Sequence, residues 1–144
     1  MGILTKVTPD FISNAVGFKQ GNLFAGEALA DGDACYIKSD GLAWKCVNTA
    51  KDSFTTVDDN AGTDNTVWDI SMFDGFSFGT VAVGEPVTLF GRDSILTYGS
   101  GLTPGALYYV AGAGNEGKLS DAAIGTNDSA IAKAVSATKI RVLR

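Results

Sequence analysis

The chain has 144 residues, 45% of them hydrophobic and 19% charged, which is the composition of a single globular domain with its own core. The formal net charge of −5 argues against a surface for nucleic-acid phosphates, and no apolar run approaches the ~20 residues of a membrane span. The absence of histidine excludes Ser–His–Asp and Cys–His catalysis, so we expect no enzyme. From the net charge and the lack of a long apolar run, we expect no nucleic-acid partner and no membrane partner.

Residues 1–25 are predicted to form an N-terminal arm. They lack the basic start and apolar stretch of a secretion signal, which predicts synthesis and assembly in a cytoplasm. Thr8-Pro9-Asp10 is compatible with the start of a short helix, and an extended arm fits equally well. The arm contains too many apolar side chains for an uncovered tail, so the domain's core or a neighbouring subunit must cover them: Ile3, Leu4, Phe11, Ile12, Val16, Phe18, Leu23 and Phe24.

Residues 26–47 are predicted to form the first β-hairpin of a β-rich domain that covers 26–144. If Asp40 and Gly41 form a two-residue turn, Cys35 lies opposite Cys46 and Ile37 lies opposite Trp44. Period-2 alternation then puts these four side chains on one apolar face. In a reducing cytoplasm we expect two buried free thiols rather than a disulfide.

Residues 48–65 are polar and are predicted to form an exposed loop. The oxygen-rich segment 58–64 invites a calcium site but does not match the EF-hand pattern, and a solvated loop explains it as well. Residues 67–78 are strongly apolar and aromatic, with a turn expected at Asp74-Gly75.

The rest of the chain predicts further short strands. Hairpins are expected over 86–98 and 106–119, followed by strands over 130–135 and 138–143. In the last strand Ile140 and Val142 alternate with Lys139 and Arg141, which predicts one buried and one exposed face. Residues 30–37, 82–90 and 103–110 repeat one phrase, a glycine turn followed by a short apolar strand. About nine short strands without a long helix predict an all-β barrel or sandwich.

The carboxylates and aromatic residues are the remaining candidates for chemistry. Most carboxylates fall in turn sequences, where bonding to nearby backbone explains them, so no catalytic, cofactor-binding or metal-binding residues are predicted. The aromatic residues could line a sugar-binding groove, and core packing or a subunit interface explains them too: Trp68, Phe73, Phe76, Phe78, Tyr98, Tyr108 and Tyr109.

A series of turn-and-strand phrases resembles the head decoration (cement) proteins of tailed bacteriophages. The series comprises Gly84-Glu85-Pro86-Val87, then 100–105 (Ser-Gly-Leu-Thr-Pro-Gly), Tyr108-Tyr109-Val110 and Gly117-Lys118-Leu119. The segment 26–34 follows the same style, so the resemblance covers about residues 26–143. Similar phrases occur in phage head-fibre and tail-fibre domains, which keeps a carbohydrate-binding fibre module as the alternative.

The resemblance implies a compact, β-tulip-like body with an N-terminal arm. It implies a homotrimer seated on the exterior of the virion, where it would bind the major capsid protein and stabilise the head. The arm residues Ile3, Leu4, Phe11, Ile12, Val16 and Phe18 would then contact the capsid or an adjacent copy. Tyr108, Tyr109 and Trp68 are the candidates for contacts between subunits.

Overall fold

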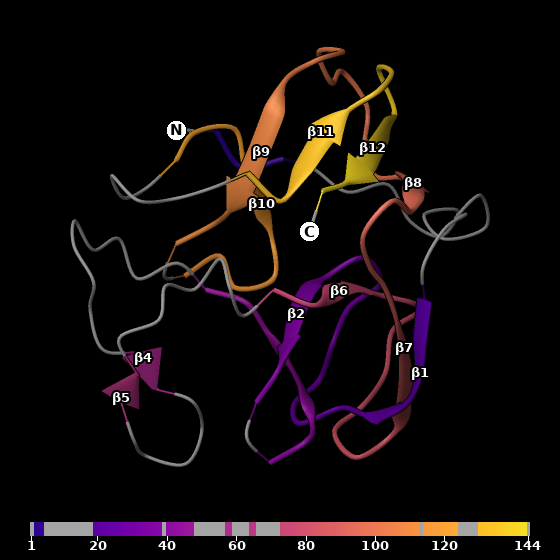
Figure 1. Cartoon of the computed structure of the whole chain (residues 1–144), viewed down its shortest axis with the longest axis vertical. Coiled ribbons are helices and arrows are strands. Elements are labelled where there is room, and N and C mark those ends of the chain that lie inside the picture. The colour runs from indigo at the N-terminus through magenta and orange to yellow at the C-terminus, as the bar shows by residue number, and fades with distance from the viewer. Residues whose placement is uncertain are drawn as a thin grey trace.

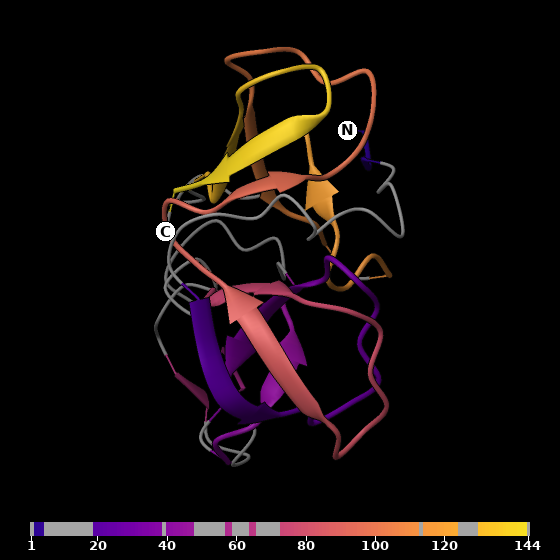
Figure 2. The ribbon, with the colours of Figure 1, turned by 90° about the vertical axis from the view of Figure 1, so that its right-hand side faces the viewer.

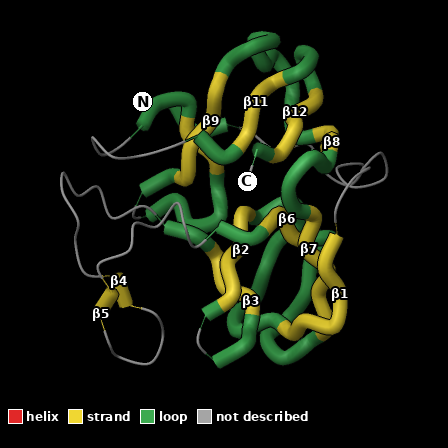
Figure 3. Tube along the Cα trace, viewed as in Figure 1, coloured by secondary structure: helices red, strands yellow, loops and turns green. Residues whose placement is uncertain are grey.

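The computed structural model describes residues 2–4, 19–38, 40–47, 57–58, 64–65, 73–112, 114–123 and 130–143. Throughout these residues the protein is all-β, which confirms the predicted fold class (Figure 3). Two antiparallel five-stranded sheets, sheet I and sheet II, pack into a compact, sandwich-like body (Figure 1). The described part of the chain contains no helix long and apolar enough to cross a membrane.

The two sheets take their strands from different parts of the sequence. Sheet I contains, in spatial order, β1 (Lys19–Phe24), β7 (Pro86–Phe90), β6 (Gly75–Ser77), β2 (Ala34–Ile37) and β3 (Ala43–Lys45). Sheet II contains β10 (Leu119–Ser120), β9 (Leu107–Val110), β11 (Ala132–Ala134), β12 (Lys139–Val142) and β8 (Ile95–Thr97). A separate hairpin pairs β4 (Val57–Asp58) with β5 (Asp64–Asn65), inside the predicted polar loop.

The repeated glycine phrase forms the same turn each time. Gly32, Gly84 and Gly105 have φ of 82°, 84° and 89°, values that favour glycine at the third position of a type II turn. In each turn the residue after the glycine donates its N–H to the carbonyl three residues earlier, at 3.1, 3.1 and 2.9 Å. The three turns lead into β2, β7 and β9, as the repeat predicted.

Sheet I curls until its two edge strands approach each other. Ala25, directly after β1, forms a parallel bridge with Ala43 of β3, and the Gly26 N–H donates to the Ala43 carbonyl at 2.8 Å. Figure 2 shows β1 and β7 side by side on one wall of this curled sheet. Its interior holds a small apolar cluster, the inner core: Ala25, Leu29, Cys35, Ala43, Val87 and Leu89.

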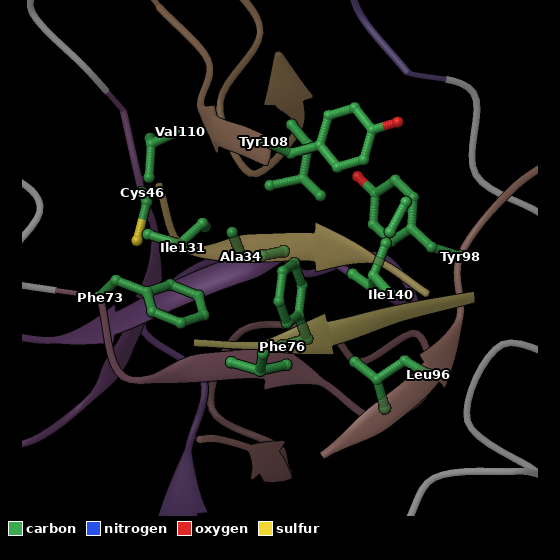
Figure 4. Packing of buried hydrophobic residues seen from close by; sticks show 14 of the residues in the cluster. Ala34, Cys46, Phe73, Phe76, Leu96, Tyr98, Tyr108, Val110, Ile131 and Ile140 are labelled. Carbon is green, nitrogen blue, oxygen red and sulfur yellow. The ribbon is translucent and has the colours of Figure 1, made fainter. Parts of the chain in front are cut away.

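A larger cluster, the main core, fills the space between the two sheets (Figure 4). Alternation along β2 sends Ala34 and Tyr36 into the main core and Cys35 into the inner core, because successive strand residues point to opposite faces. Sheet II contributes only one face, and Ile140 and Val142 of β12 are fully buried there. Sheet I is therefore covered on its inner face and over part of its outer face, and sheet II on one face.

Backbone hydrogen bonds also connect the two sheets. The Gly117 N–H donates to the Cys46 carbonyl, and the Ala34 N–H donates to the Gly117 carbonyl, both at 2.8 Å. A Cβ at position 117 would lie 2.9 Å from the carboxyl carbon of Asp33, so glycine also permits the close approach here. The turn before β10 thus joins sheet II to the start of β2.

The first hairpin is present, but the predicted register is wrong by one residue. Tyr36 lies opposite Trp44, and Cys35 lies opposite Lys45 rather than Cys46. The loop has three residues instead of two, since the Lys38 N–H bonds to the Leu42 carbonyl at 3.1 Å. The third loop residue, at position 41, has φ of 80°.

This shift separates the two cysteines, which the predicted register had placed on one face. Cys35 lies in the inner core and Cys46 in the main core, because a one-residue slip moves a side chain to the opposite face. Both thiols are buried and form no disulfide, which confirms that part of the prediction. Trp44 likewise lies on the main-core side, away from Ile37.

Two predicted turns in the middle of the chain are wrong. The segment 86–98 is not a hairpin, because β7 belongs to sheet I and β8 to sheet II, and the chain crosses between the sheets at 91–94. Gly75 begins β6 rather than forming a turn with Asp74. A Cβ at Gly75 would lie 2.8 Å from the Phe90 carbonyl oxygen, so this glycine permits close approach of β6 to β7.

The last two predicted units are confirmed. Leu119 of β10 pairs with Val110 of β9, within the predicted hairpin 106–119. β11 pairs with β12, and Lys133 lies opposite Arg141. The predicted alternation is present in β12, where Ile140 is buried and Arg141 is exposed.

Part of the predicted arm belongs to the β body. Residues 19–24 form β1, which pairs along β7 as an integral strand of sheet I. Ile3 bridges to Ser120, and the Asp121 N–H donates to the Gly2 carbonyl at 3.0 Å, so residues 2–4 extend the edge of sheet II beside β10. The two ends of the predicted arm are therefore held by different sheets.

Candidate interaction surfaces

The arm residues predicted to contact a partner divide into two groups. Leu4 donates its backbone N–H to the Leu119 carbonyl at 3.2 Å and packs against the main core, and Ile3 is half-buried beside it. These two residues attach the chain to its own body. The other predicted contacts lie outside the described residues and stay predictions: Phe11, Ile12, Val16 and Phe18.

The three predicted inter-subunit residues also have different positions. Tyr108 has only 3% of its surface exposed and lies in the main core, so its side chain packs within its own chain, and its contact with another subunit stays a prediction. Tyr109, the next residue, is half-buried because it points to the opposite face of β9. Trp68 lies outside the described residues.

Most of the aromatic residues considered for a sugar groove are packed in the core. The Phe76 ring lies 5.2 Å from the Phe73 ring and 5.9 Å from the Tyr98 ring, both in edge-to-face geometry (Figure 4). Burial raises the pKa of the Tyr98 phenol above its ordinary value of 10. The Asp33 carboxylate raises this pKa further, and a backbone hydrogen bond at Leu119 opposes both effects.

The carboxylates that the structure describes serve turns and strand ends. Asp33 accepts the Ala30 N–H at 2.8 Å, and Asp74 accepts the Ile37 N–H at 2.8 Å. No group of three or more Cys, Asp or Glu side chains that could hold a metal ion occurs among these described positions.

The outer face of sheet I carries an exposed apolar surface beside the part that sheet II covers. We call it the phenylalanine patch; it consists of Phe24, Phe78, Val83 and Pro86. Phe24 of β1 pairs directly with Pro86 of β7, and the Phe78 N–H bonds to Thr88 of β7 at 2.8 Å. The exposed fractions of Phe24, Phe78 and Val83 are 48%, 51% and 66%.

The patch rests on buried structure. The Phe78 ring lies 6.0 Å from the ring of Phe90, which packs against the main core. Phe76, two residues before Phe78 and on the same face of β6, is completely buried. The edge of sheet II therefore determines which phenylalanines of this face are covered.

Two carboxylates border the phenylalanine patch. Asp31 Oδ1 accepts the N–H of Gly79, the residue after Phe78, at 2.8 Å. Glu85 Oε1 accepts the Ala82 N–H at 2.7 Å, in the turn that carries Val83. Because each carboxylate is held through one oxygen, its position beside the patch is fixed by the backbone.

The outer face of sheet II has the opposite character. We call it the basic face; it consists of Leu107, Lys133, Val135, Lys139 and Arg141. Strands β8, β9, β11 and β12 contain no aspartate or glutamate. Leu107 and Val135 add exposed apolar area, with exposed fractions of 43% and 41%.

The cations of the basic face lie on adjacent strands. Lys133 is directly opposite Arg141, an arrangement of like charges that destabilises a strand pair. Lys139 is in β12, two residues before Arg141 on the same face. None of the three has an ion-pair partner among the residues that the structure describes.

Local sequence patterns indicate several of these residues but not their grouping into two surfaces. The alternation in 138–143 predicted an exposed face with Lys139 and Arg141, and the pairing of β11 with β12 adds Lys133. By sequence alone, Phe24 falls in the predicted arm and Phe78 in the aromatic segment 67–78. A signal for the patch exists in Phe76-Ser77-Phe78, whose alternation puts both rings on one face, but coverage by sheet II is a long-range property.

These two surfaces contain all the exposed large hydrophobic side chains in the part of the chain that the structure describes. A scan against protein-family models and a search of curated proteins found no match to this chain. The chemistry of the two surfaces is therefore the basis for inferring what they bind.

Proposed function

We propose that this protein is a non-enzymatic structural protein of a phage virion, which binds the major capsid protein lattice from outside as a homotrimer and stabilises the head. The observation that carries the proposal is the gathering of exposed apolar side chains on two faces of a compact β body. Contiguous exposed apolar surface is typical of protein interaction sites. The resemblance of the turn-and-strand phrases to phage cement proteins supplies the kind of partner.

The mechanism is mass action. A protein that binds only the assembled shell stabilises that state by an amount set by its affinity and concentration. Copies joined in one oligomer bind the lattice at several points, and the later contacts become intramolecular. Contacts of modest strength can then hold the complete shell together.

The position of the predicted arm suggests which residues contact the shell. Residues 2–4 are attached to sheet II and residues 19–24 to sheet I, with 5–18 between them. That segment contains the four remaining predicted contact residues: Phe11, Ile12, Val16 and Phe18. We expect it to bind the capsid surface, in continuity with the sequence prediction.

Co-sedimentation with purified shells of the major capsid protein from the same genome tests the proposal. The wild-type chain is expected to pellet with shells in a saturable manner. A variant whose residues 6–17 are replaced by a glycine–serine segment of equal length should pellet at least tenfold less well. This design keeps residues 2–4 and β1, which a simple deletion of the N-terminus would remove.

The control and the contradicting result are equally direct. The double substitution Ser100→Ala and Thr103→Ala changes exposed loop residues and should leave pelleting unchanged. If the wild-type chain does not pellet with shells at any concentration, the proposal is wrong. Specific binding to a glycan array in that case would favour the carbohydrate-binding fibre module instead.

A further inference from the structure

The phenylalanine patch and the basic face are complementary in chemistry. Both offer exposed apolar area, Phe24 and Phe78 on one side and Leu107 and Val135 on the other. The carboxylates of Asp31 and Glu85 border the patch, whereas the basic face carries only cations. Complementary charge around an apolar centre is the usual arrangement of a specific protein interface.

The two surfaces cannot meet within one molecule. The patch lies on the face of sheet I that packs against sheet II, outside the part that sheet II covers, whereas the basic face is the face of sheet II that points away from the main core. We propose that copies of this chain join head to tail, with the phenylalanine patch of one copy on the basic face of the next. The inference deepens the proposed function, because it assigns the contact that builds the oligomer.

Electrostatics favour this contact over the two symmetrical alternatives. Patch against patch would bring together the Asp31 and Glu85 carboxylates of both copies. Face against face would bring together six cations, three from each copy. Like charges across an interface are unfavourable, whereas the head-to-tail contact places carboxylates beside the cations.

The contact also relieves a repulsion within each copy. Lys133 and Arg141 are opposite each other on neighbouring strands, with no described carboxylate between them. Carboxylates from the next copy would supply the missing opposite charge. Because Asp31 and Glu85 are already fixed by hydrogen bonds from the backbone N–H groups of Gly79 and Ala82, little ordering accompanies binding.

A contact between two unlike surfaces has a geometric consequence. Such a heterologous contact forms a ring if the rotation between copies closes, and an open chain if it does not. Three copies that close would give the expected trimer, in which every patch and every basic face is occupied. The open surfaces of a single copy would both disappear.

Two variants separate the halves of the contact. The patch variant carries Phe24→Ser and Phe78→Ser, and the face variant carries Lys133→Glu and Arg141→Glu. Sedimentation velocity is expected to show a closed oligomer for the wild-type chain and a monomer for each variant alone. An equimolar mixture should give a dimer and nothing larger, because it has one intact patch and one intact face per pair.

A matched control isolates the site from the change in charge. Arg92→Glu with Lys118→Glu reverses two exposed cations outside the basic face and should keep the wild-type mass. Circular dichroism should show the wild-type β signal for all variants. If either site variant has lost that signal, Phe78→Ser alone and Arg141→Glu alone replace the doubles in the same mixing experiment.

Three results would overturn the inference: a monomeric wild-type chain, an oligomeric variant, or a mixture that stays monomeric.

Duplex DNA provides a further arm of the experiment. Saturable DNA binding that the face variant loses, in a chain that stays monomeric, would assign the basic face to nucleic acid instead. Pelleting with shells reports separately on the proposed function. A monomer that pellets with shells contradicts only the head-to-tail contact. A ring that does not pellet contradicts only the capsid role.

Discussion

Sheet I and sheet II have the same number of strands and share the main core, yet the surfaces that they leave exposed differ in chemistry. The outer face of sheet I carries phenylalanine and proline bordered by carboxylates, and that of sheet II carries lysine and arginine with two aliphatic side chains. The architecture therefore does not determine these surfaces. Their difference indicates a contact between unlike partners rather than a self-complementary one.

The charges of the two regions differ in the same direction. The described residues of 19–90 that build sheet I and its loops, leaving aside the β4–β5 hairpin, contain six carboxylates and three lysines. The described residues from 91 to 143 contain three carboxylates and five basic side chains. An overall charge of −5 thus conceals a basic sheet, and the composition alone could not reveal it.

The largest expected effect is a difference in unfolding free energy between substitutions at two phenylalanines, one within β6 and one directly after it. Phe76 is fully buried, so Phe76→Ala should lower the free energy of unfolding by about 3–5 kcal/mol. Phe78 is 51% exposed, so Phe78→Ala should lower it by about 1 kcal/mol or less while abolishing self-association. Urea unfolding measures both losses, and equal losses would contradict the division into core and patch.

The next effect concerns the scaffold beneath the patch. Gly75→Ala puts a Cβ 2.8 Å from the Phe90 carbonyl oxygen, and neither backbone can move easily. We expect a loss of about 1–3 kcal/mol in the free energy of unfolding, as for other overpacked sites. Ser100→Ala, in an exposed loop, is the control and should change that free energy by less than about 0.5 kcal/mol.

The third effect concerns the core that the two sheets share. Burial raises the pKa of Tyr98, so the folded protein keeps the phenol proton above pH 10 while the unfolded chain releases it. The contribution of this phenol to the free energy of unfolding is therefore fully present below pH 10. Above pH 10 it falls by about 1 kcal/mol per pH unit. Tyr98→Phe should flatten the loss of stability between pH 10 and 11. An unchanged slope would show that the phenol does not titrate with unfolding.

The smallest effect lies on the basic face. Lys133→Thr removes the like-charge pair with Arg141, so the isolated copy should gain about 0.2–1 kcal/mol in unfolding free energy. The same substitution should weaken self-association, since the contact loses a cation. Lys118→Thr is the control outside the face. If the Lys133→Thr variant associates as well as the wild-type chain, Lys133 does not contribute to the contact.

Local patterns were sufficient for much of the fold. The glycine phrase located β2, β7 and β9, because a type II turn needs a positive φ that glycine readily adopts. Alternation located the buried face of β12. The predicted pairing of Cys35 with Cys46 is wrong because one extra loop residue shifts every cross-strand pair. Asp-Gly is compatible with both loop lengths, so the sequence does not distinguish them.

The rest of the structure depends on contacts distant in sequence. The chain crosses from β7 to β8 between different sheets, although the same turn residues would suit a hairpin. Tyr108 and Tyr109 are adjacent aromatic residues, and only the position of the main core makes the first buried and the second half-buried. The phenylalanine patch is exposed because sheet II does not cover Phe78. No local sequence pattern indicates where this coverage ends.

The central claim is that unlike surfaces of this β body join copies of the chain into a closed oligomer. The molar mass of the full-length wild-type chain, measured by sedimentation equilibrium from low to high micromolar concentration, tests it most directly. The prediction is a discrete species near three times the 14.9 kDa of one chain, which dissociates toward the monomer on dilution and in high salt. A mass of 14.9 kDa at every concentration would contradict the claim.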